Sequence, residues 1–277
     1  MSKQAEVARV EEMQSFSDAT SWRALGEGRF AGEVDGRWGQ GRAVYGGIVG
    51  AGLTRAMRAS VADDRQLRSF SLTFAGPVEG GALECTTEVL RSGRSATFVS
   101  GAVIQGGTTR ASATATFGVP RRSALPIHTP ERPDAPPPEE GAAMPYLEGM
   151  TPSFTQRVDF RYTHGGFPCT GSTTPHIAGW CRFNRDSDAA DAAGILALID
   201  TWPAPALSML GAPAPASSIT WSVDLFEPRP DARLDEWWYF DTRTAFIADG
   251  YTSFEASLWA PDGKYVARSC QLVGVFG

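Results

Sequence analysis

Asp200 is a carboxylate set into an almost wholly apolar run, AAGILALIDTW at 192–202. At helical spacing it lies one turn after Leu196 and projects from the same face. An ionised carboxylate against a core costs several kcal/mol unless hydrogen bonds or charges satisfy it. Asp200 therefore either has polar partners, in which case it can accept a proton from water, or points to solvent near the helix end, where Pro203 ends or kinks the helix.

Two adjacent glycines, Gly46 and Gly47, form a second feature with chemical potential. They end the glycine-rich segment at 36–47, and the apolar residues of 48–61 follow at helical spacing. Backbone amides at a helix start can receive an oxyanion, and glycine lets a substrate carbonyl come close to the backbone. The structural alternative is a tight strand-to-helix turn. The spacing is not GxGxxG and no βαβ unit follows, which argues against a dinucleotide loop.

The elements that must position these residues form a unit of strand, helix and four antiparallel strands, and the sequence contains this unit twice. In the first half we expect a helix at 48–61 and strands at 30–35, 67–74, 82–91, 95–105 and 108–119, the last four as an antiparallel meander. In the second half we expect a helix at 189–202 and strands at 154–163, 177–184, 217–226, 236–246, 251–260 and 264–276. Two copies of such a unit can bury their helices and sheet faces around a shared interface.

A proline-rich segment separates the two units. Nine of the nineteen prolines fall between 120 and 152, where apolar periodicity is lost, so this is a linker or an irregular wrapping segment. We expect an N-terminal arm ending in a short helix or loop at 1–28, a first domain at 29–119, the linker at 120–153 and a second domain at 154–277.

Composition argues against several classes of protein. The chain is 42% hydrophobic and 20% charged with a net charge of −6, which is typical of a globular protein and unlike a nucleic-acid binder. No apolar run approaches the roughly 20 residues that span a bilayer, and the N-terminus has no apolar signal region. Four scattered cysteines without a CxxC, and three histidines without helix-spaced partners, indicate neither disulfides nor a metal site. We expect a cytoplasmic protein.

The order and spacing of these segments resemble a known family. Each half resembles a hotdog fold, and the chain from about Arg29 to Phe276, without the linker, resembles the double-hotdog acyl-CoA thioesterases of the thioesterase II type, in the thioesterase-like superfamily. The segments that carry the resemblance are VYGGIVGAGL at 44–53, ALIDT at 197–201 and PDGKYVARSCQ at 261–271. AAGILALIDT is also similar to the GGxxxALADT pattern of single-hotdog thioesterases. The resemblance implies an α+β double hotdog, with two tandem units that each wrap a long helix in an antiparallel sheet.

The resemblance also implies a catalytic group of Asp, Thr or Ser, and Gln that together hold a water molecule. Its positions fall on Asp200, Ser218 and Gln271. Asp200 would accept a proton from the water while the other two orient it, and Gly46 and Gly47 would form the oxyanion hole. Gln271 cannot ionise, so it can donate to Asp200 without adding a second charge.

The internal repeat gives a check on these positions that needs no knowledge of the family. Laid over the first half, the triad and the glycine pair correspond as follows: Asp200 to Thr54, Ser218 to Leu67, Gln271 to Ala115, and Gly46 and Gly47 to Ala192 and Ala193. The polar triad and the glycine helix start thus occur once each, in opposite halves. A pseudo-twofold would create two equivalent clefts, of which only one contains the polar triad and the glycine helix start. Thr220, expected on the same strand face as Ser218, is an alternative hydroxyl.

We expect the chain to hydrolyse acyl-CoA to the free acid and CoA, with no metal or redox cofactor. Arg42 and Arg94 are candidates for contacts to the CoA phosphates, and Trp38 and Trp202 for lining an acyl tunnel, although surface solvation and core packing are their ordinary roles. The resemblance implies a homodimer or larger assembly, and no nucleic-acid or membrane partner. The alternatives are a non-catalytic acyl-CoA or fatty-acyl binding hotdog protein and, less favoured, a hotdog enoyl-CoA hydratase, which would bring a histidine beside its Asp. No GxSxG motif is present, so a serine nucleophile elbow is not expected.

Overall fold

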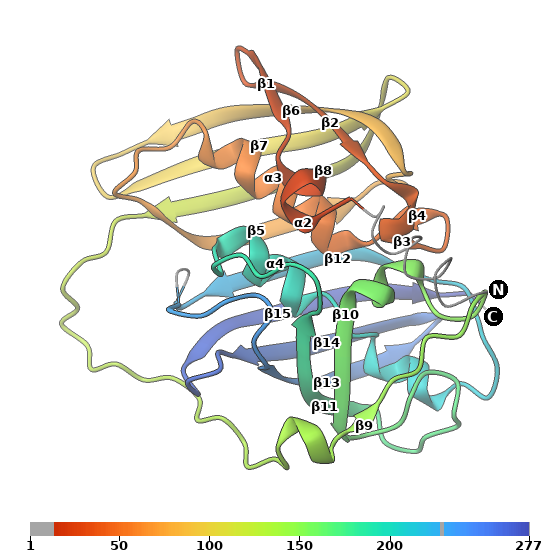
Figure 1. Ribbon diagram of the computed structural model, residues 1–277. Helices are drawn as coiled ribbons and strands as arrows, with labels where there is room; N and C mark the ends of the chain where they lie inside the picture. Colours follow the sequence, from red (N-terminus) through yellow and green to blue (C-terminus); the bar gives the residue numbers. More distant parts are fainter. Residues whose placement is uncertain (1–13, 228–229, 277) are drawn as a thin grey trace.

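One continuous antiparallel sheet forms the body of the molecule in the computed structural model, which describes residues 14–227 and 230–276 (Figure 1). Its order, from one edge to the other, is β1 (Arg23–Gly26), β2 (Arg29–Val34), β6 (Gly81–Ser92), β7 (Ala96–Gln105), β8 (Thr108–Gly118), β5 (Gln66–Phe74), β12 (Ala216–Leu225), β15 (Tyr265–Val275), β14 (Tyr251–Trp259), β13 (Trp238–Ala248), β11 (His176–Phe183), β10 (Val158–His164) and β9 (Ala142–Ala143). The short strands β3 (Gly39–Gln40) and β4 (Ala43–Val44) pair separately.

The two halves of the chain meet at the central pair, β5 and β12. On either side of this pair the strands follow in matching order, β8-β7-β6-β2 in the first half and β15-β14-β13-β11 in the second. The expected repeat and the double-hotdog fold are therefore confirmed. The expected meander is wrong at one point, because β5 pairs with β8 and not with β6. This pairing leaves the other edge of β5 free to join the halves.

A β-bulge at the same place in both halves fixes the residue correspondence. The register shifts in β5 between Leu67 and Ser69, and in β12 between Ser218 and Thr220. Because a bulge inserts one extra residue into a strand, matching bulges align Leu67 with Ser218. The neighbouring pairs agree, since Ala115 lies opposite Phe70 as Gln271 lies opposite Trp221. The structure thus reproduces the alignment drawn from the sequence.

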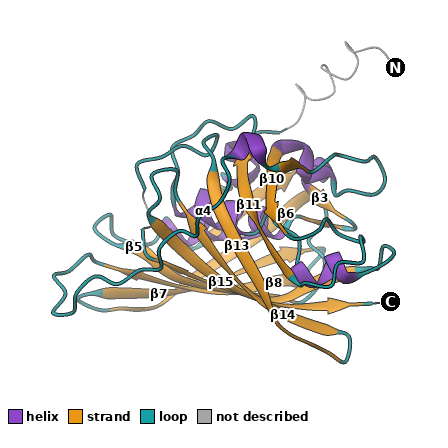
Figure 2. Cartoon of the chain, turned by 90° about the horizontal axis from the view of Figure 1, so that it is seen from below, coloured by secondary structure: helices purple, strands orange, loops and turns teal. Residues whose placement is uncertain are grey.

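Two helices, α3 (Gly46–Arg58) and α4 (Ala192–Ile199), lie against the inner face of the curved sheet (Figure 2). The helix α3 begins at the glycine pair, as expected. The expected helix at 189–202 is too long at both ends. Asp191 caps the start by accepting a hydrogen bond from the Gly194 amide at 2.7 Å. At the other end the Thr201 hydroxyl donates to the Leu198 carbonyl at 2.8 Å, and the following Trp-Pro step disfavours helix.

The remaining short elements include two edge strands that the sequence did not reveal, β1 and β9. The short helix α2 (Phe16–Thr20) falls within the expected arm, whose residues 1–13 lie outside the described residues. Short 3-10 helices lie between the other elements: η1 (Gly36–Trp38), η2 (Pro138–Glu140), η3 (Ser153–Arg157) and η4 (Pro205–Met209). Across the described residues, no helix is both long enough and apolar enough to cross a bilayer.

The proline-rich segment packs against the outer face of the second half. Trp180 and Trp259 each donate an indole N–H to one of its carbonyls, at Pro136 (2.8 Å) and Pro130 (3.2 Å). Arg132 lies over the Trp180 ring at 5.0 Å. The segment is therefore a wrapping strap, which is the second of the two interpretations offered above. The domain limits at 29–119 and 154–277 stay a prediction.

Candidate active site

Asp200 is the C-cap residue that ends α4, with φ −96° and ψ 0°, and not a residue inside the helix. Its backbone N–H donates to the Ala197 carbonyl at 3.3 Å, which closes the last turn. The side chain is partly buried and is hydrogen-bonded, so the alternative of a carboxylate pointing freely to solvent is wrong. The apolar helix thus delivers one carboxylate to a defined place in the interior.

A chain of two hydrogen bonds joins Asp200 to β15 and β12. The Gln271 amide nitrogen Nε2 donates to Asp200 Oδ1 at 2.5 Å, and the Ser218 hydroxyl donates to Gln271 Oε1 at 2.9 Å. Both bonds together fix which end of the Gln271 amide faces the carboxylate. Ser218 and Gln271 share the inner face because Ser218 lies opposite Val273, two residues beyond Gln271. The structure therefore brings together the three residues that the sequence singled out.

The start of α3 lies directly against this carboxylate. A Cβ added to Gly46 would be 2.8 Å from Asp200 Oδ2 and 3.0 Å from Cζ of Phe74, and one added to Gly47 would overlap the Tyr45 side chain. The Gly47 backbone amide lies near enough to Asp200 to lower the pKa of its carboxyl. A side chain at either position would therefore clash with its neighbours, so both positions require glycine. The positive end of the α3 dipole faces the one acidic side chain of the network.

Burial is the largest influence on the acidity of Asp200. It raises the pKa of the carboxyl from 3.8 to about 7, against the lowering effects of the Gln271 amide and the Gly47 N–H. A carboxyl with a pKa near neutrality can be ionised in the resting protein and still hold a proton during a reaction. This is the property that a general base needs at physiological pH.

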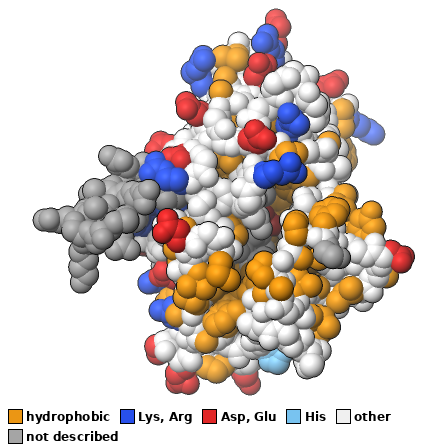
Figure 3. All heavy atoms as spheres, turned by 90° about the vertical axis from the view of Figure 1, so that its right-hand side faces the viewer, with side chains coloured by type: hydrophobic (Ala, Val, Ile, Leu, Met, Phe, Trp, Pro, Cys, Tyr) orange, Lys and Arg blue, Asp and Glu red, His pale blue; other side chains and the backbone are white. Residues whose placement is uncertain are grey.

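Hydrophobic side chains surround the network on the side of Ser218. Val273, opposite Ser218, packs with Ala204 and Phe254, and the partly buried Leu207 and Val275 extend this cluster. Seen from the side that is on the right in Figure 1, hydrophobic side chains gather over the half of the molecule built by the second unit (Figure 3). The network therefore borders an apolar region suited to a hydrocarbon group.

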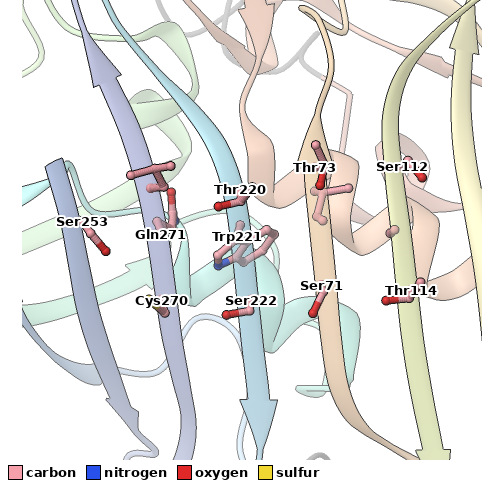
Figure 4. Close-up of a pocket in the computed structure, with 13 residues that line it drawn as sticks. Ser71, Thr73, Ser112, Thr114, Thr220, Trp221, Ser222, Ser253, Cys270 and Gln271 are labelled. Atoms are coloured by element: carbon pink, nitrogen blue, oxygen red, sulfur yellow. The ribbon is translucent and has the colours of Figure 1, made fainter. Parts of the chain in front are cut away.

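Thr220 is not a rival to Ser218. An unbroken strand would place the two residues on one face, but the bulge at Ile219 sends Thr220 to the opposite face. There Thr220 is exposed and lines a groove of about 450 Å³ along the seam (Figure 4). Hydroxyl side chains of β12, β5 and β8 line the same groove, namely Ser222, Ser71 and Thr114. The alternation rule failed because a bulge cannot be read from this sequence.

The two tryptophans proposed for an acyl tunnel are core residues. Trp38 is fully buried, packs edge-on against Phe183 and has Arg157 over its ring at 5.5 Å. Trp202 is 5% exposed, and its ring is parallel to that of Phe240 at 5.3 Å between centroids. Their ordinary role, packing, accounts for both side chains.

The two candidate arginines lie at different ends of the first half. Arg42 is exposed in the turn between β3 and β4, close to the start of α3 along the chain. Arg94 is exposed after the last residue of β6. Strand β6 begins at Gly81, three residues after Val78. The Val78 carbonyl accepts a hydrogen bond from the backbone N–H of Val44, which lies two residues before the start of α3. Twelve strand residues, roughly 40 Å, therefore separate Arg94 from the α3 start. The structure does not bring Arg94 to the site.

Tyr45 is a site residue that sequence reasoning missed. It precedes the glycine pair, its hydroxyl donates to the Ala197 carbonyl near the end of α4, and its ring stacks on Phe154 at 4.2 Å. Burial, with the nearby Asp200 charge adding to it, raises the pKa of Tyr45. Tyr45 thus ties the start of α3 to the end of α4. A lone aromatic residue at the end of a glycine-rich segment was the only signal in the sequence.

The corresponding positions in the first half carry none of this network. Leu67 and Ala115 are buried apolar residues, 2% and 3% exposed, and Thr54 replaces the carboxylate. The helix start that faces them carries Ala192 and Ala193 instead of glycines. The asymmetry inferred from the sequence is present in the structure.

The fold and its structural relatives define a double-hotdog protein of the thioesterase II type. The family model of the acyl-CoA thioesterase N-terminal domain matches residues 34–118, and that of the acyl-CoA thioesterase C-terminal domain matches residues 133–275. The chain belongs to the acyl-CoA thioesterase family.

Solved structures share the fold over nearly the whole chain. A candidate thioesterase II of Thermobifida fusca is 26% identical, with a TM-score of 0.83 over 96% of this chain and 99% of that one. A hotdog protein of unknown function from Alicyclobacillus acidocaldarius is 22% identical, with a TM-score of 0.85 over 96% and 99%. The acyl-CoA thioesterase II TesB2 of Mycobacterium marinum is 17% identical, with a TM-score of 0.76 over 95% and 99%. A search of curated proteins gives no match.

Proposed function

We propose that this protein hydrolyses acyl-CoA thioesters to a carboxylic acid and free CoA, with Asp200, Ser218 and Gln271 as the catalytic residues. The observation that carries the proposal is the continuous hydrogen-bonded chain from Ser218 through Gln271 to Asp200, placed against the start of α3. Family membership supports the reaction class. No metal or redox cofactor enters the proposal. Association of two or more chains, expected from the resemblance, is part of it.

The geometry suggests how the residues divide the work. Asp200 takes a proton from a water molecule whose oxygen attacks the thioester carbonyl carbon, and Gln271 and Ser218 hold that water. The carbonyl oxygen becomes an oxyanion and receives the amides of Gly46 and Gly47. Because Asp200 is protonated at that moment, it attracts the nearby Gly47 amide less, and that amide is available to the oxyanion. The carbon–sulfur bond then breaks, and the proton passes from Asp200 to the leaving CoA thiolate.

Direct measurement of thiol release tests the proposal against its alternatives. The purified chain is mixed with acyl-CoA substrates of increasing chain length, and free CoA is followed with a thiol-reactive dye. We expect turnover, favoured by apolar acyl groups because the cluster around Val273 borders the network. Binding of acyl-CoA without any thiol release would establish the binding protein instead, and hydration of an enoyl-CoA would establish the hydratase.

The rate of hydrolysis is expected to depend on pH through Asp200. Because the ionised carboxylate is the active form and its pKa is about 7, kcat/KM should rise about tenfold per pH unit below 7 and level off above it. Initial rates of thiol release at constant ionic strength, from about pH 5 to about pH 9, give this profile. A profile that is flat from pH 5 to 8 would contradict the role of Asp200 as the base.

Replacing Gln271 with Ala is expected to lower kcat more than it raises KM, because Gln271 positions the water and not the substrate. The Gln271 amide lowers the pKa of Asp200, so its removal should also move the pH profile to higher pH. The fold should tolerate the change, since alanine occupies the corresponding position, Ala115, in the first half. Steady-state kinetics across pH test both effects. An increase in KM alone, with the profile unmoved, would place Gln271 in substrate binding.

A further inference from the structure

Phe74 stands beside the catalytic network, on the side away from the apolar cluster around Val273. It is the last residue of β5, and Thr73 before it lines the outer groove, so alternation turns the Phe74 side chain to the inner face. Thr73 pairs with Thr220 of β12, which places Phe74 next to the bulge that follows Ser218. Val273 lies opposite Ser218 on the other side of β12. Apolar side chains therefore flank the network on both sides.

The edge of the Phe74 ring reaches the space beside Gly46. A Cβ at Gly46 would be 3.0 Å from Cζ of Phe74 and 3.7 Å from its Cε1, and the same point is 2.8 Å from Asp200 Oδ2. Carbon atoms that are not bonded to one another pack at roughly 3.5–4.0 Å. A single methyl group in this space would therefore press on the ring. The flat carbonyl of a thioester fits here only while no extra carbon projects towards Phe74.

The backbone of Phe74 is held firmly in the sheet. Phe74 pairs with Ala111 of β8, and the N–H groups of Ala75 and Gly76 donate to the Arg110 carbonyl at 2.8 and 3.0 Å. Strand β5 has a partner on each side, in the middle of the sheet. A side chain carried by such a strand keeps its position more precisely than one on a loop. The ring packs against the core and keeps part of its surface exposed, as a cleft wall requires.

The repeat supplies a comparison with the cleft that lacks the triad. The alignment through the bulges places Phe74 on Leu225 and Gly46 on Ala192. Leu225 is buried, with 4% of its surface exposed. The catalytic cleft therefore combines the smallest residue at the helix start with a large flat ring, whereas the other combines alanine with leucine. The space that Gly46 leaves is thus bounded by the ring of Phe74.

We propose that Phe74 sets the specificity for the carbon next to the thioester carbonyl. The protein accepts acyl groups with a methylene at that carbon and rejects those that carry two methyl branches there. A carbon with two branches has no hydrogen to turn towards the ring, so one of its methyl groups meets Phe74. The rest of the acyl chain extends towards Val273 and Leu207, in the apolar cluster. The inference rests on the proposed hydrolysis, because it requires the thioester to bind beside Gly46.

Two isomeric substrates, hexanoyl-CoA and 2,2-dimethylbutanoyl-CoA, test the proposal by thiol release. They have the same number of carbons, and the difference in their intrinsic reactivity is the same for every variant. The ratio of their kcat/KM values therefore compares the variants alone. Phe74→Ala is expected to lower the preference for hexanoyl-CoA on the order of 10- to 100-fold, because one methylene too many in a site of fixed shape changes kcat/KM roughly 10- to 200-fold.

Phe98→Ala is the matched control. Phe98 is 41% exposed on β7, which does not border the network, so this variant should keep the wild-type preference. Phe74→Leu preserves more of the packing against the core than alanine does, and should lower the preference by a smaller factor. Melting temperatures show that each variant is folded.

The outcomes separate this inference from the proposed hydrolysis. If the wild type, Phe74→Ala and Phe74→Leu all release thiol with one and the same preference, Phe74 does not set the specificity, and this inference is overturned while hydrolysis stands. If the wild type releases no thiol from hexanoyl-CoA or from any other straight-chain acyl-CoA, the proposed hydrolysis is wrong and this inference falls with it.

Discussion

Replacing Asp200 with Asn is expected to lower kcat for thioester hydrolysis on the order of 10³-fold while making the folded protein more stable. The rate falls because the amide cannot accept a proton from water, and general-base catalysis contributes roughly 10²- to 10⁴-fold in enzymes. The hydrogen bond from Gln271 can remain, since the Asn carbonyl accepts it as the carboxylate does.

The gain in stability follows from the raised pKa of Asp200. Between pH 4 and 7 the folded carboxyl keeps its proton while the unfolded one is ionised, so the unfolded state binds fewer protons and stability falls as pH rises. Above pH 7 the loss of folding stability is complete. It amounts to up to about 4 kcal/mol for a shift of the Asp200 pKa from 3.8 to about 7. The variant should therefore melt at a higher temperature than the wild type at pH 8, and no higher at pH 3.

Thermal unfolding at both pH values and thiol release at pH 8 measure the two effects. Asp224→Asn is the matched control, because Asp224 is an exposed carboxylate on β12, and this variant should change neither quantity. An Asp200→Asn protein that keeps wild-type kcat, or is less stable at pH 8, would refute the assignment of Asp200 as a desolvated base.

Replacing Gly46 with Ala is expected to lower kcat/KM on the order of 10²-fold. The added methyl would stand 2.8 Å from Asp200 Oδ2 and 3.0 Å from Phe74, in the space between the helix start and the carboxylate. In the proposal this space receives the reacting carbonyl. If the methyl keeps the oxyanion from one of its two amide donors, the transition state loses stabilisation on the order of 3 kcal/mol. An alanine elsewhere in a helix stabilises by up to about 1 kcal/mol, but crowding here should cost about 1–3 kcal/mol.

Gly36→Ala provides the comparison for this variant. A Cβ at Gly36 would meet nothing within 4 Å, so activity and melting temperature should stay close to those of the wild type. If Gly46→Ala hydrolyses acyl-CoA at the wild-type rate, the start of α3 does not contribute to the reaction as proposed.

The sequence predicted most of the sheet, because its strands alternate clearly and end at glycine turns. The strands β5 to β8 and β12 to β15 match the expected ranges within one or two residues at most ends. The edge strands β1 and β9 carry no such alternation, since every residue of both is exposed. Helix α4 was expected to reach 202, because an apolar run does not show where a threonine hydroxyl closes the last turn.

The sequence predicted those site residues that can be identified from their position along the chain. It did not predict the direction in which individual side chains point. Asp200, Ser218 and Gln271 follow from the family resemblance and the repeat, and the structure brings them together. The face of Thr220 depends on a bulge, and the burial of Trp38 depends on contacts with Phe183 and Arg157, distant in sequence. Neither the bulge nor these contacts can be recognised from the residues next to Thr220 or Trp38 in the sequence.

The pairing of β5 with β12 has a consequence for the integrity of the chain. Five residue pairs, from Ser69 with Asp224 to Thr73 with Thr220, run across the middle of the sheet. If either half were expressed alone, one of these strands would become an open edge with unsatisfied backbone groups, a template for aggregation. Each cleft also takes its helix start from one half and its facing residues from the other. Neither half would therefore contain a complete cleft by itself.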